Sequence, residues 1–327
     1  MAKGSNMSEP VYSDDLLILV ARCYYIDNLQ QAQIARLVNV SQSKISRLLN
    51  LARERGLVRV SVPEYQPRHA VLEANLRQHL GLDAVVIRAG STRNGADLRQ
   101  AIGYFAGPVA VAWVTSNSVV ALAGGRGMRA LVDHMKPAAP DGSVTIIQAM
   151  GNIDSCPGPY DAVELGRILA SRWRAPFLTL NVPGILPDAA TCRQFLQLEQ
   201  ISSVAARLRN ATLTFIGIGT LENSVFVERN VLGPRQIALL RRAGAVGEML
   251  GRFYDAEGRE CPTEFRDRVV SLPLESVHSL PNVVAVVTGS DRSAAIRAAA
   301  RGGLIKGLII DEGGAASVLE SHTAEAT

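Results

Sequence analysis

Side chains that can read DNA bases and bind phosphate recur along one short segment, QSKISRLLNLAR, which begins at Gln42. Glutamine can pair with adenine through two hydrogen bonds, and arginine or lysine can pair with guanine in the same way. Gln42, Ser43 and Arg47 are therefore candidates for reading bases, whereas Lys44 suits a phosphate equally well. The full set of expected DNA contacts is Gln42, Ser43, Lys44, Ser46, Arg47 and Arg53. The alternative for any one of them is an ordinary position on a solvated helix face, since most protein–DNA contacts hold the protein on the phosphate backbone and do not read the base sequence.

A helix-turn-helix must hold these side chains, and the segment 31–50 has its spacing. Asn39 falls at the turn, where one residue needs a left-handed backbone that Asn tolerates. Ser41 is a suitable N-cap for the second helix. Such a helix lies in the major groove with its N-terminal side chains toward base edges. The inward face of the two helices would be formed by Ile34, Ala35, Val38, Val40, Ile45 and Leu48.

Flanking segments extend this motif into a domain. A supporting helix is expected to begin at Ser13, and residues 57–62 alternate partly between apolar and polar, which is typical of a short β-wing. The sequence therefore predicts a winged helix-turn-helix domain over residues 1–62. The prolines that follow interrupt both strand and helix, so residues 63–82 are expected to be a linker and a linker helix at 69–80.

Charge is concentrated in the same region. The 327 residues carry a formal net charge of only +4, with an isoelectric point near 9.0. Between residues 36 and 59, however, six basic residues accompany a single acid, Glu54. A basic run alone is usually a solvated face, but together with the helix-turn-helix spacing it indicates contact with phosphates. Double-stranded operator DNA is the expected partner.

Composition limits which classes of protein the chain can belong to. The chain is 47% hydrophobic, enough for a sizeable core, and its length suggests two domains. Four scattered cysteines lack the spacing of a metal site or a disulfide scaffold, so free thiols and no metal are expected. The sequence shows neither a membrane-spanning apolar stretch nor a signal peptide. We expect a soluble, cytoplasmic protein with no membrane partner.

From about residue 84 onward, short β-branched runs alternate with longer helical stretches. This alternation predicts a parallel, doubly wound α/β sheet in a second, larger domain at residues 83–327. The expected strands cover 84–87, 118–123, 144–148, 177–181, 213–219, 283–288 and 308–311. The expected helices cover 96–112, 126–135, 160–172, 192–208, 234–243 and 291–301.

Glycines cluster in the loops that follow these strands, which is where such sheets bind ligands. Backbone amides in these turns, together with a helix N-terminus, form an anion site suited to phosphate, and Arg126 adds a bidentate donor. No turn has the dinucleotide fingerprint or the P-loop lysine, so no cofactor is expected. Each glycine alone is more often a plain turn, but four such turns at one sheet edge, the fourth being at Pro183 and Gly184, favour a pocket. The candidate residues are Gly124, Gly125, Arg126, Gly127, Gly151, Gly217 and Gly219.

Three stretches carry a resemblance to a known family. They are IGIGTLENS, GAVGEMLGRFYDAEG at 244–258, and the closing segment from VVAVVTGSDRS to GGAASVL. With the helix-turn-helix, they resemble the SorC family of sugar-responsive bacterial transcriptional regulators, also called the sugar-binding DeoR-like group, over roughly 13–320. The resemblance implies an N-terminal DNA-binding domain and a C-terminal effector domain similar to sugar-phosphate isomerases and deaminases, usually assembled as a tetramer.

The resemblance implies effector contacts only where the family's pattern matches. GGRGM at 124–128 stands where the family commonly has W-G-R-T, so Gly125 and Arg126 match and Gly127 replaces the usual threonine. Asp255, in FYDAEG, matches an acid that members use on the sugar.

The closing loop departs from the pattern. In TGSDRS, Gly289 matches, whereas Arg292 stands where the family commonly has lysine. Arginine keeps the charge but changes the geometry, and the missing threonine removes a hydroxyl donor. An unphosphorylated polyol or sugar therefore remains an alternative to a sugar phosphate.

The sequence thus predicts a transcriptional regulator that is controlled by a small sugar, sugar phosphate or polyol and acts on a carbohydrate catabolism operon as a homo-oligomer, dimer or tetramer. The rival hypothesis is a sugar-phosphate isomerase or deaminase-like enzyme. The five histidines form no recognisable constellation with the glycine loops, so no catalytic residue is expected, although acids can also act as bases. A nonspecific architectural DNA-binding protein would not need so large a second domain.

Overall fold

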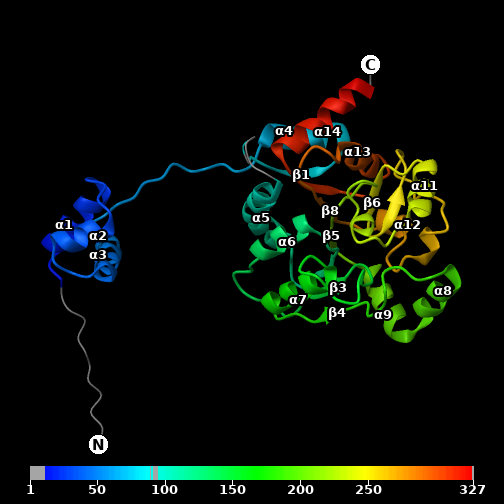
Figure 1. Ribbon diagram of the computed structural model, residues 1–327, viewed down its shortest axis with the longest axis horizontal. Coiled ribbons are helices and arrows are strands. Elements are labelled where there is room, and N and C mark those ends of the chain that lie inside the picture. Colours follow the sequence, from blue (N-terminus) through cyan, green and yellow to red (C-terminus); the bar gives the residue numbers. More distant parts are fainter. Residues whose placement is uncertain (1–11, 89, 91–94, 326–327) are drawn as a thin grey trace, which may run out of the picture. The chain divides into compact units, whose positions relative to one another are not determined.

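The computed structural model describes residues 12–88, 90 and 95–325. The chain divides into two compact units, with the boundary between Tyr65 and Gln66 (Figure 1). Each unit is described by itself below.

The first unit contains three helices: α1 (Asp14–Tyr25), α2 (Gln31–Leu37) and α3 (Gln42–Glu54). The predicted turn and cap form, since Asn39 adopts a φ of 52° and the Ser41 hydroxyl accepts a hydrogen bond from the Lys44 amide at 3.3 Å. Arg55 closes the bundle by donating to Asp14 at 2.7 Å. The core is formed by fully buried Leu17, Val20, Ile34, Ile45 and Leu48.

The expected β-wing is not formed in the described part of this unit. Residues 57–62 contain no strand, and Val60 and Val62 are 65% and 78% exposed. Alternation alone does not make a strand, because each strand needs a partner for its backbone groups, and Pro63 follows without a second alternating run. The first unit is therefore a three-helix helix-turn-helix followed by an extended segment.

The second unit is built on a parallel seven-stranded sheet in the order β1-β9-β8-β5-β2-β3-β4. All seven predicted strands form, although the fourth is only two residues long. Their bounds are β1 (Asp83–Ile87), β2 (Val119–Leu122), β3 (Thr145–Gln148), β4 (Phe177–Leu178), β5 (Leu213–Ile216), β8 (Val283–Val286) and β9 (Gly307–Asp311).

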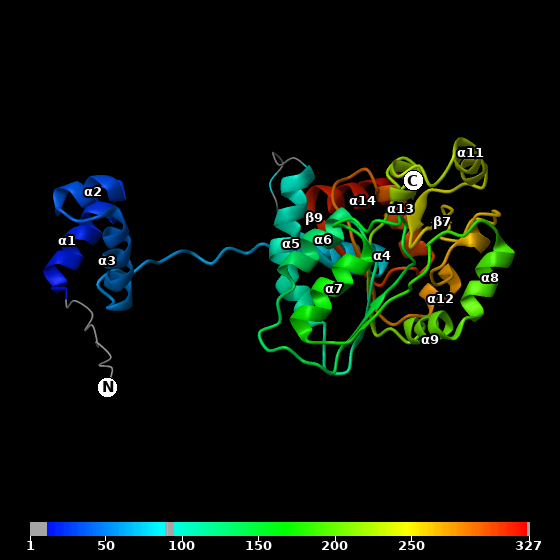
Figure 2. The same cartoon turned by 60° about the horizontal axis from the view of Figure 1, so that its bottom comes forward.

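Helices cover both faces of this sheet, as a doubly wound fold requires. One face packs against α5 (Gly95–Ala112), α6 (Arg126–His134) and α7 (Ala162–Trp173), which lie side by side in Figure 2. The other face packs against α4 (Ala70–Leu80), α9 (Glu199–Leu208), α12 (Leu274–His278), α13 (Ser293–Arg301) and α14 (Glu312–Glu325). Strand residues alternate between the two cores: Val85 and Ile87 point to the first, and Ala84 and Val86 to the second.

Two helical expectations are refined by the structure. The predicted helix over 192–208 is two helices, α8 (Ala189–Gln197) and α9, because Leu198 between them has an extended backbone with ψ of 131°. The predicted linker helix forms as α4, and its Leu76 is fully buried in the core of the second unit. The remaining helical segments are α10 (Val225–Glu228), α11 (Pro234–Arg242) and the short η1 (Arg266–Arg268).

A small antiparallel hairpin, β6 (Gly247–Met249) and β7 (Arg252–Tyr254), was not predicted. Its two-residue turn has positive φ at both Leu250 and Gly251, the geometry of a tight hairpin turn. Three-residue strands joined by Leu-Gly lack the usual Asn-Gly signal. The hairpin is joined to the loop after β5, since the Gly219 and Glu248 backbones exchange two hydrogen bonds of 2.9 Å.

The order of the strands creates a crevice. The chain runs from β2 outward to β3 and β4, and then returns to the opposite side of β2 as β5. Open α/β sheets bind ligands at such a switch point, beyond the carboxyl ends of the strands. The hairpin lies over this same edge because it is tied to the end of β5.

Candidate effector site

A cavity of about 410 Å³ lies at the switch point. Its walls come from the segments that follow β2, β3, β5 and β8, from the loop before α7, and from the hairpin. This volume is in the range of small-molecule sites. The cavity brings together most of the predicted effector residues, namely Gly124, Gly125, Arg126, Gly127, Gly151, Gly217, Gly219 and Arg292.

Two predicted residues are not in the cavity wall. The Asp255 carboxylate accepts the backbone amides of Glu257 and Arg259, each at 2.9 Å, and so holds the turn after β7. The hairpin reverses the chain between Glu248 and Asp255, which is why Glu248 and not Asp255 faces the cavity. The amide of Gly289 donates to Asp311 at 2.7 Å, so this glycine fixes the loop after β8 to the end of β9 and does not face the cavity.

One end of the cavity is cationic. Helix α6 begins with Arg126 and helix α13 follows Arg292, and neither helix has a side chain capping its N-terminus. Free amides and the positive end of the helix dipole favour an anion there. The guanidiniums contact exposed acids, Arg126 with Glu228 at 2.6 Å and Arg292 with Asp291 at 2.7 Å. Exposed ion pairs are weak, so both arginines remain able to bind a ligand.

Arg99, on α5, lines the same end of the cavity and was not predicted. Burial lowers the pKa of its guanidinium, and the positive charges of Arg126 and Arg292 lower it further. The sequence gives no signal for this residue, because a single arginine near the start of an amphipathic helix looks like any solvated position.

Glu248 provides an acid at the hairpin side of the cavity and was also not predicted. Its side chain accepts one hydrogen bond, from the Gly251 amide at 2.7 Å, and the residue is 8% exposed. Burial raises the pKa of this carboxyl from 4.5 to about 7, while the bond from Gly251 acts in the opposite direction. A lone acid within the apolar run V-G-E-M-L was the available signal.

The backbone near Glu248 requires glycine. A Cβ at Gly219 would lie 2.8 Å from Glu248 Oε2, so a larger residue would displace the carboxylate. At the neighbouring turn, a Cβ at Gly124 would lie 2.8 Å from the Tyr160 carbonyl oxygen. These two predicted glycines are thus explained by close approach of other groups.

Neutral amides form part of the remaining wall. Gln148 donates to Asn152 Oδ1 at 2.8 Å and accepts the Leu180 amide at 3.1 Å, so its orientation is fixed. A salt bridge holds the adjacent loop: Arg229 donates to Asp161 at 2.6 and 3.1 Å and to Asp154 at 2.8 Å. These bonds raise the pKa of the Arg229 guanidinium, and they keep the wall in one conformation.

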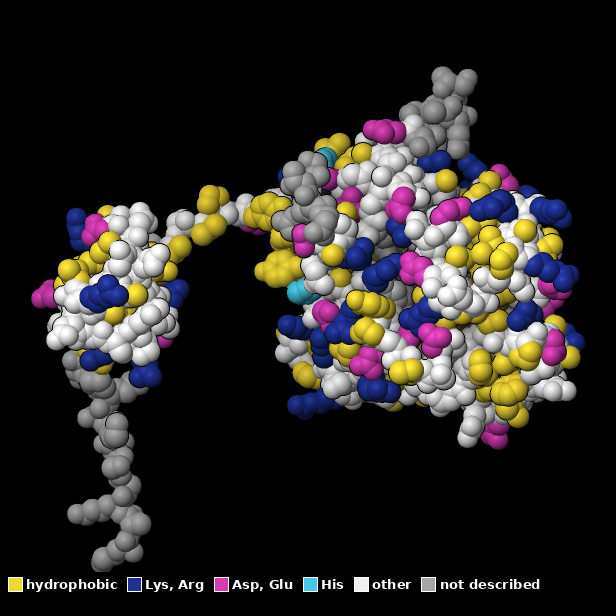
Figure 3. Space-filling model, in the orientation of Figure 1, with side chains coloured by type: hydrophobic (Ala, Val, Ile, Leu, Met, Phe, Trp, Pro, Cys, Tyr) yellow, Lys and Arg dark blue, Asp and Glu magenta, His cyan; other side chains and the backbone are white. Residues whose placement is uncertain are grey.

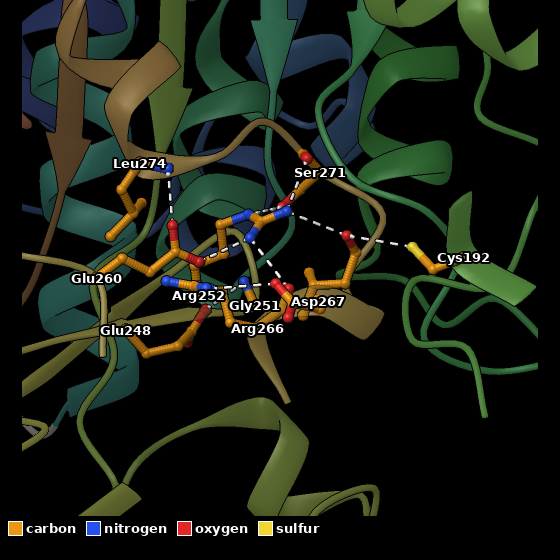
Figure 4. Close-up of polar contacts among 10 residues, drawn as sticks. Cys192, Glu248, Gly251, Arg252, Glu260, Arg266, Asp267, Ser271 and Leu274 are labelled. Carbon is orange, nitrogen blue, oxygen red and sulfur yellow. Dashed lines mark hydrogen bonds and ion pairs between the residues drawn. The ribbon is translucent and has the colours of Figure 1, made fainter. Parts of the chain in front are cut away.

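Strand β7 of the same hairpin carries a buried charge of opposite sign, Arg252, whose hydrogen-bond partners all belong to the protein (Figure 4). Its guanidinium pairs with Glu260 at 2.6 Å and donates to the Ser271 hydroxyl at 3.0 Å. Three carbonyls, those of Arg266, Val269 and Ser271, accept at 3.1 to 3.2 Å. Arg252 thereby uses all its donors within the protein and acts as a structural tie.

In the first unit, the predicted DNA-contacting residues lie on α3 away from its core. Gln42, Ser43, Ser46, Arg47 and Arg53 are exposed, and Figure 3 shows Lys and Arg side chains on the surface of this unit. Lys44 is half-buried, with its ammonium 5.2 Å from the Tyr12 ring centroid. Five of the six are thus available for contact.

Within the residues that the structure describes, no cluster of His, Cys, Asp and Glu could hold a metal ion. No described helix is long and apolar enough to cross a bilayer.

The fold and the cavity define a doubly wound α/β unit with a ligand-sized cavity at its switch point, and comparison with known proteins gives its family. The family model described as "Putative sugar-binding domain" matches residues 66–320, and the chain belongs to this family. The resemblance to SorC-type regulators is therefore confirmed.

The similarity extends over both units. The transcriptional regulator LsrR of Enterobacter sp. (strain 638) is 27% identical over 314 residues, covering 94% of this chain and 93% of the relative. The deoxyribonucleoside regulator of Bacillus subtilis (strain 168) is 25% identical, covering 91% and 95%. The full-length sorbitol operon regulator SorC from Klebsiella pneumoniae has the same fold, with a TM-score of 0.71 at 22% identity, covering 94% of this chain and 100% of that one. These relatives are named as regulators and not as enzymes.

Proposed function

We propose that this protein is a transcriptional regulator in which the three-helix unit binds operator DNA and the α/β unit binds a small sugar, sugar phosphate or polyol. Its target is an operon of carbohydrate catabolism, and it acts in the cytoplasm as a homo-oligomer, dimer or tetramer. The observation that carries the proposal is that one chain combines an exposed, basic recognition helix with a polar cavity at a topological switch point.

The chemistry of the cavity suits a polyhydroxylated ligand. Arg126, Arg292 and two uncapped helix N-termini lie at one end and favour a phosphate. Glu248 at the hairpin accepts a hydrogen bond from a hydroxyl when its carboxyl is ionised. A ligand with a phosphate at one end and hydroxyls along its length can bind the cationic end of the cavity and Glu248 at the same time.

Control of DNA binding follows from linkage. If the effector changes the affinity for DNA by some factor, DNA must change the affinity for the effector by the same factor. In a dimer, two recognition helices bind half-sites separated by whole turns of DNA, so a ligand that changes how the copies are arranged changes the fit to the operator. The effector binds more tightly to one of these arrangements.

The test is a titration of full-length protein with the DNA upstream of its own gene, followed by fluorescence anisotropy, with a panel of sugars, polyols and sugar phosphates. We expect one compound to change the DNA affinity and none to be turned over. Turnover would instead favour an isomerase-like enzyme.

The same assay tests the recognition helix. Arg47→Ala is expected to weaken DNA binding by about 5- to 150-fold, because a side chain that reads a base contributes about 1 to 3 kcal/mol. Arg22→Ala, which removes an exposed cation from α1 and not from α3, is the matched control and should have a much smaller effect. Equal losses in the two variants would show that Arg47 contributes only general charge.

A further inference from the structure

We propose that the outer face of helix α5 is the interface through which two copies of this chain associate. The exposed residues of this face are Gln100, Tyr104, Pro108 and Ala112. The inference rests on the proposed function in one respect, because a regulator that places two recognition helices on DNA needs an interface between copies. Since Arg99 of the same helix lines the cavity, this interface adjoins the effector site.

Helix α5 differs from the other two helices of its layer (Figure 2) in having an uncharged outer face. No charged residue occurs between positions 100 and 112. By contrast, α6 carries a salt bridge between Arg129 and Asp133, and α7 carries one between Glu164 and Arg167. A surface helix normally has charged residues on its solvent side, and a helix that is apolar all round is normally buried. The outer face of α5 is therefore expected to be covered.

The inner face of α5 is already used within the unit, where the helix packs against α6, β1 and β9. A Cβ at Gly103 would lie 2.2 Å from the Ala130 carbonyl oxygen, and one at Gly107 would lie 2.7 Å from His134 Cβ, so α5 and α6 are in backbone contact. Ile102 is buried in the core beneath them. The side available to a partner is therefore the one opposite this contact.

The exposed side chains of α5 form a straight ridge. They stand at 100, 104, 108 and 112, which is one row of residues four positions apart. Two such rows that pack into each other's grooves give the commonest helix crossing in globular proteins. Tyr104 is the large side chain of the ridge and is 60% exposed. Its ring lies edge-on to the His134 ring, with 5.4 Å between centroids, so it is held in place. Tyrosine is enriched at protein interfaces.

The lack of charge indicates that the partner is a second copy of the chain. In a two-fold interface the same surface meets itself, so every charge on it would face a like charge of the other copy. An uncharged face avoids this repulsion and is complementary to itself. A partner of different sequence would place no such restriction on the charges of α5.

The area that a stable dimer needs shows how far the interface extends. Helix α5 has 18 residues and is therefore about 27 Å long. A specific interface takes about 800 Å² from each copy, which a strip of this length reaches only at a width of about 30 Å. Helix α5 therefore forms the centre, and neighbouring segments form the rim. One of them is the segment 136–140, KPAAP, which follows α6 and exposes Ala138, Ala139 and Pro140.

The experiment measures the molar mass and the dissociation constant of full-length protein by light scattering and sedimentation over a dilution series. Wild-type protein should be at least a dimer at micromolar concentration. Tyr104→Glu should raise the dissociation constant by at least about 30-fold, because it removes a central aromatic residue and places two carboxylates against each other. Pro108→Glu should act in the same direction without weakening the fold, since it replaces a proline inside a helix.

Leu198→Glu is the matched control. It adds the same charge at an apolar side chain of similar exposure, 53%, between α8 and α9, and should leave the dissociation constant unchanged. All three variants should keep the far-UV circular dichroism of wild type. The proposal is overturned if wild type is monomeric, if the folded α5 variants associate like wild type, or if Leu198→Glu dissociates as readily as Tyr104→Glu.

These outcomes are distinct from failure of the proposed function. A monomeric wild type would remove only the homo-oligomer from that proposal, and unchanged α5 variants would show only that the interface lies elsewhere. The regulator proposal itself fails when no effector changes DNA binding, which is measured separately.

Discussion

Glu248 and Arg252 are buried charged residues on the two strands of one hairpin, yet their surroundings differ sharply. Arg252 has a salt bridge to Glu260 and four further hydrogen bonds (Figure 4). The Glu248 carboxylate has a single hydrogen bond, from the Gly251 amide, and no cationic partner in the described part of the chain. A buried charge whose partners are all supplied by the protein stabilises structure, whereas one left short of partners beside a cavity is available to a ligand.

The comparison also explains why the hairpin is well defined although it has only three residues per strand. Arg252 ties β7 to the segment 266–271 through backbone carbonyls, and Glu248 joins β6 to the end of β5 through its backbone. One side of the hairpin is thus a structural anchor, and the other presents an acid to the site. The predictions below test this division.

The largest expected effect is that of Arg252→Met. Removing the cation leaves Glu260 as an uncompensated carboxylate whose side chain is 13% exposed, and it removes the Arg252 hydrogen bonds from three backbone carbonyls. Breaking one side of a buried ion pair costs about 3 to 5 kcal/mol. We expect the free energy of unfolding, measured with urea, to fall by that amount.

Arg259→Met is the control for this variant, because it removes an exposed arginine from the turn that follows β7. It should change the free energy of unfolding by less than about 0.5 kcal/mol. If the two variants are equally stable, Arg252 is not the anchor that its contacts indicate.

The next effect is a pH dependence caused by Glu248. Its pKa is raised to about 7 in the folded protein from 4.5, so the folded state binds the proton more tightly than the unfolded state. The resulting stabilisation is fully present below pH 4.5 and is lost as pH rises through about 7, a change of up to about 3 kcal/mol. The difference in unfolding free energy between wild type and Glu248→Gln, measured from pH 4.5 to 8, should show this decline; a constant difference would contradict it.

The smallest expected effect in free energy is on ligand affinity. Glu248→Gln should weaken binding of the compound that changes DNA affinity by about tenfold or more at pH 8, since a hydrogen bond to a charged group contributes about 1.5 to 3 kcal/mol. Asp255→Asn is the control, because Asp255 holds a turn outside the cavity wall. If calorimetry shows a larger loss of affinity for Asp255→Asn than for Glu248→Gln, then Asp255 and not Glu248 is the acid that binds the ligand.

Sequence patterns predicted much of the architecture. All seven strands of the main sheet lie where β-branched runs occur, and the helix-turn-helix forms with its turn at Asn39 and its cap at Ser41. These features depend on local preferences and on apolar periodicity, which are properties of neighbouring residues. The wing over 57–62 was wrong because pairing needs a second strand, and alternation does not provide one.

The sequence by itself determined that this chain has a helix-turn-helix with a basic second helix, a parallel sheet and glycine-rich turns with Arg126 and Arg292 at the helix starts. Only the tertiary structure decided which side chains meet at the cavity. It placed Glu248 there instead of Asp255, because the hairpin reverses the chain between them. It added Arg99, because close packing of α5 on α6 brings a distant helix to the same edge. Both outcomes depend on contacts between segments far apart in the chain, and no local pattern records such contacts.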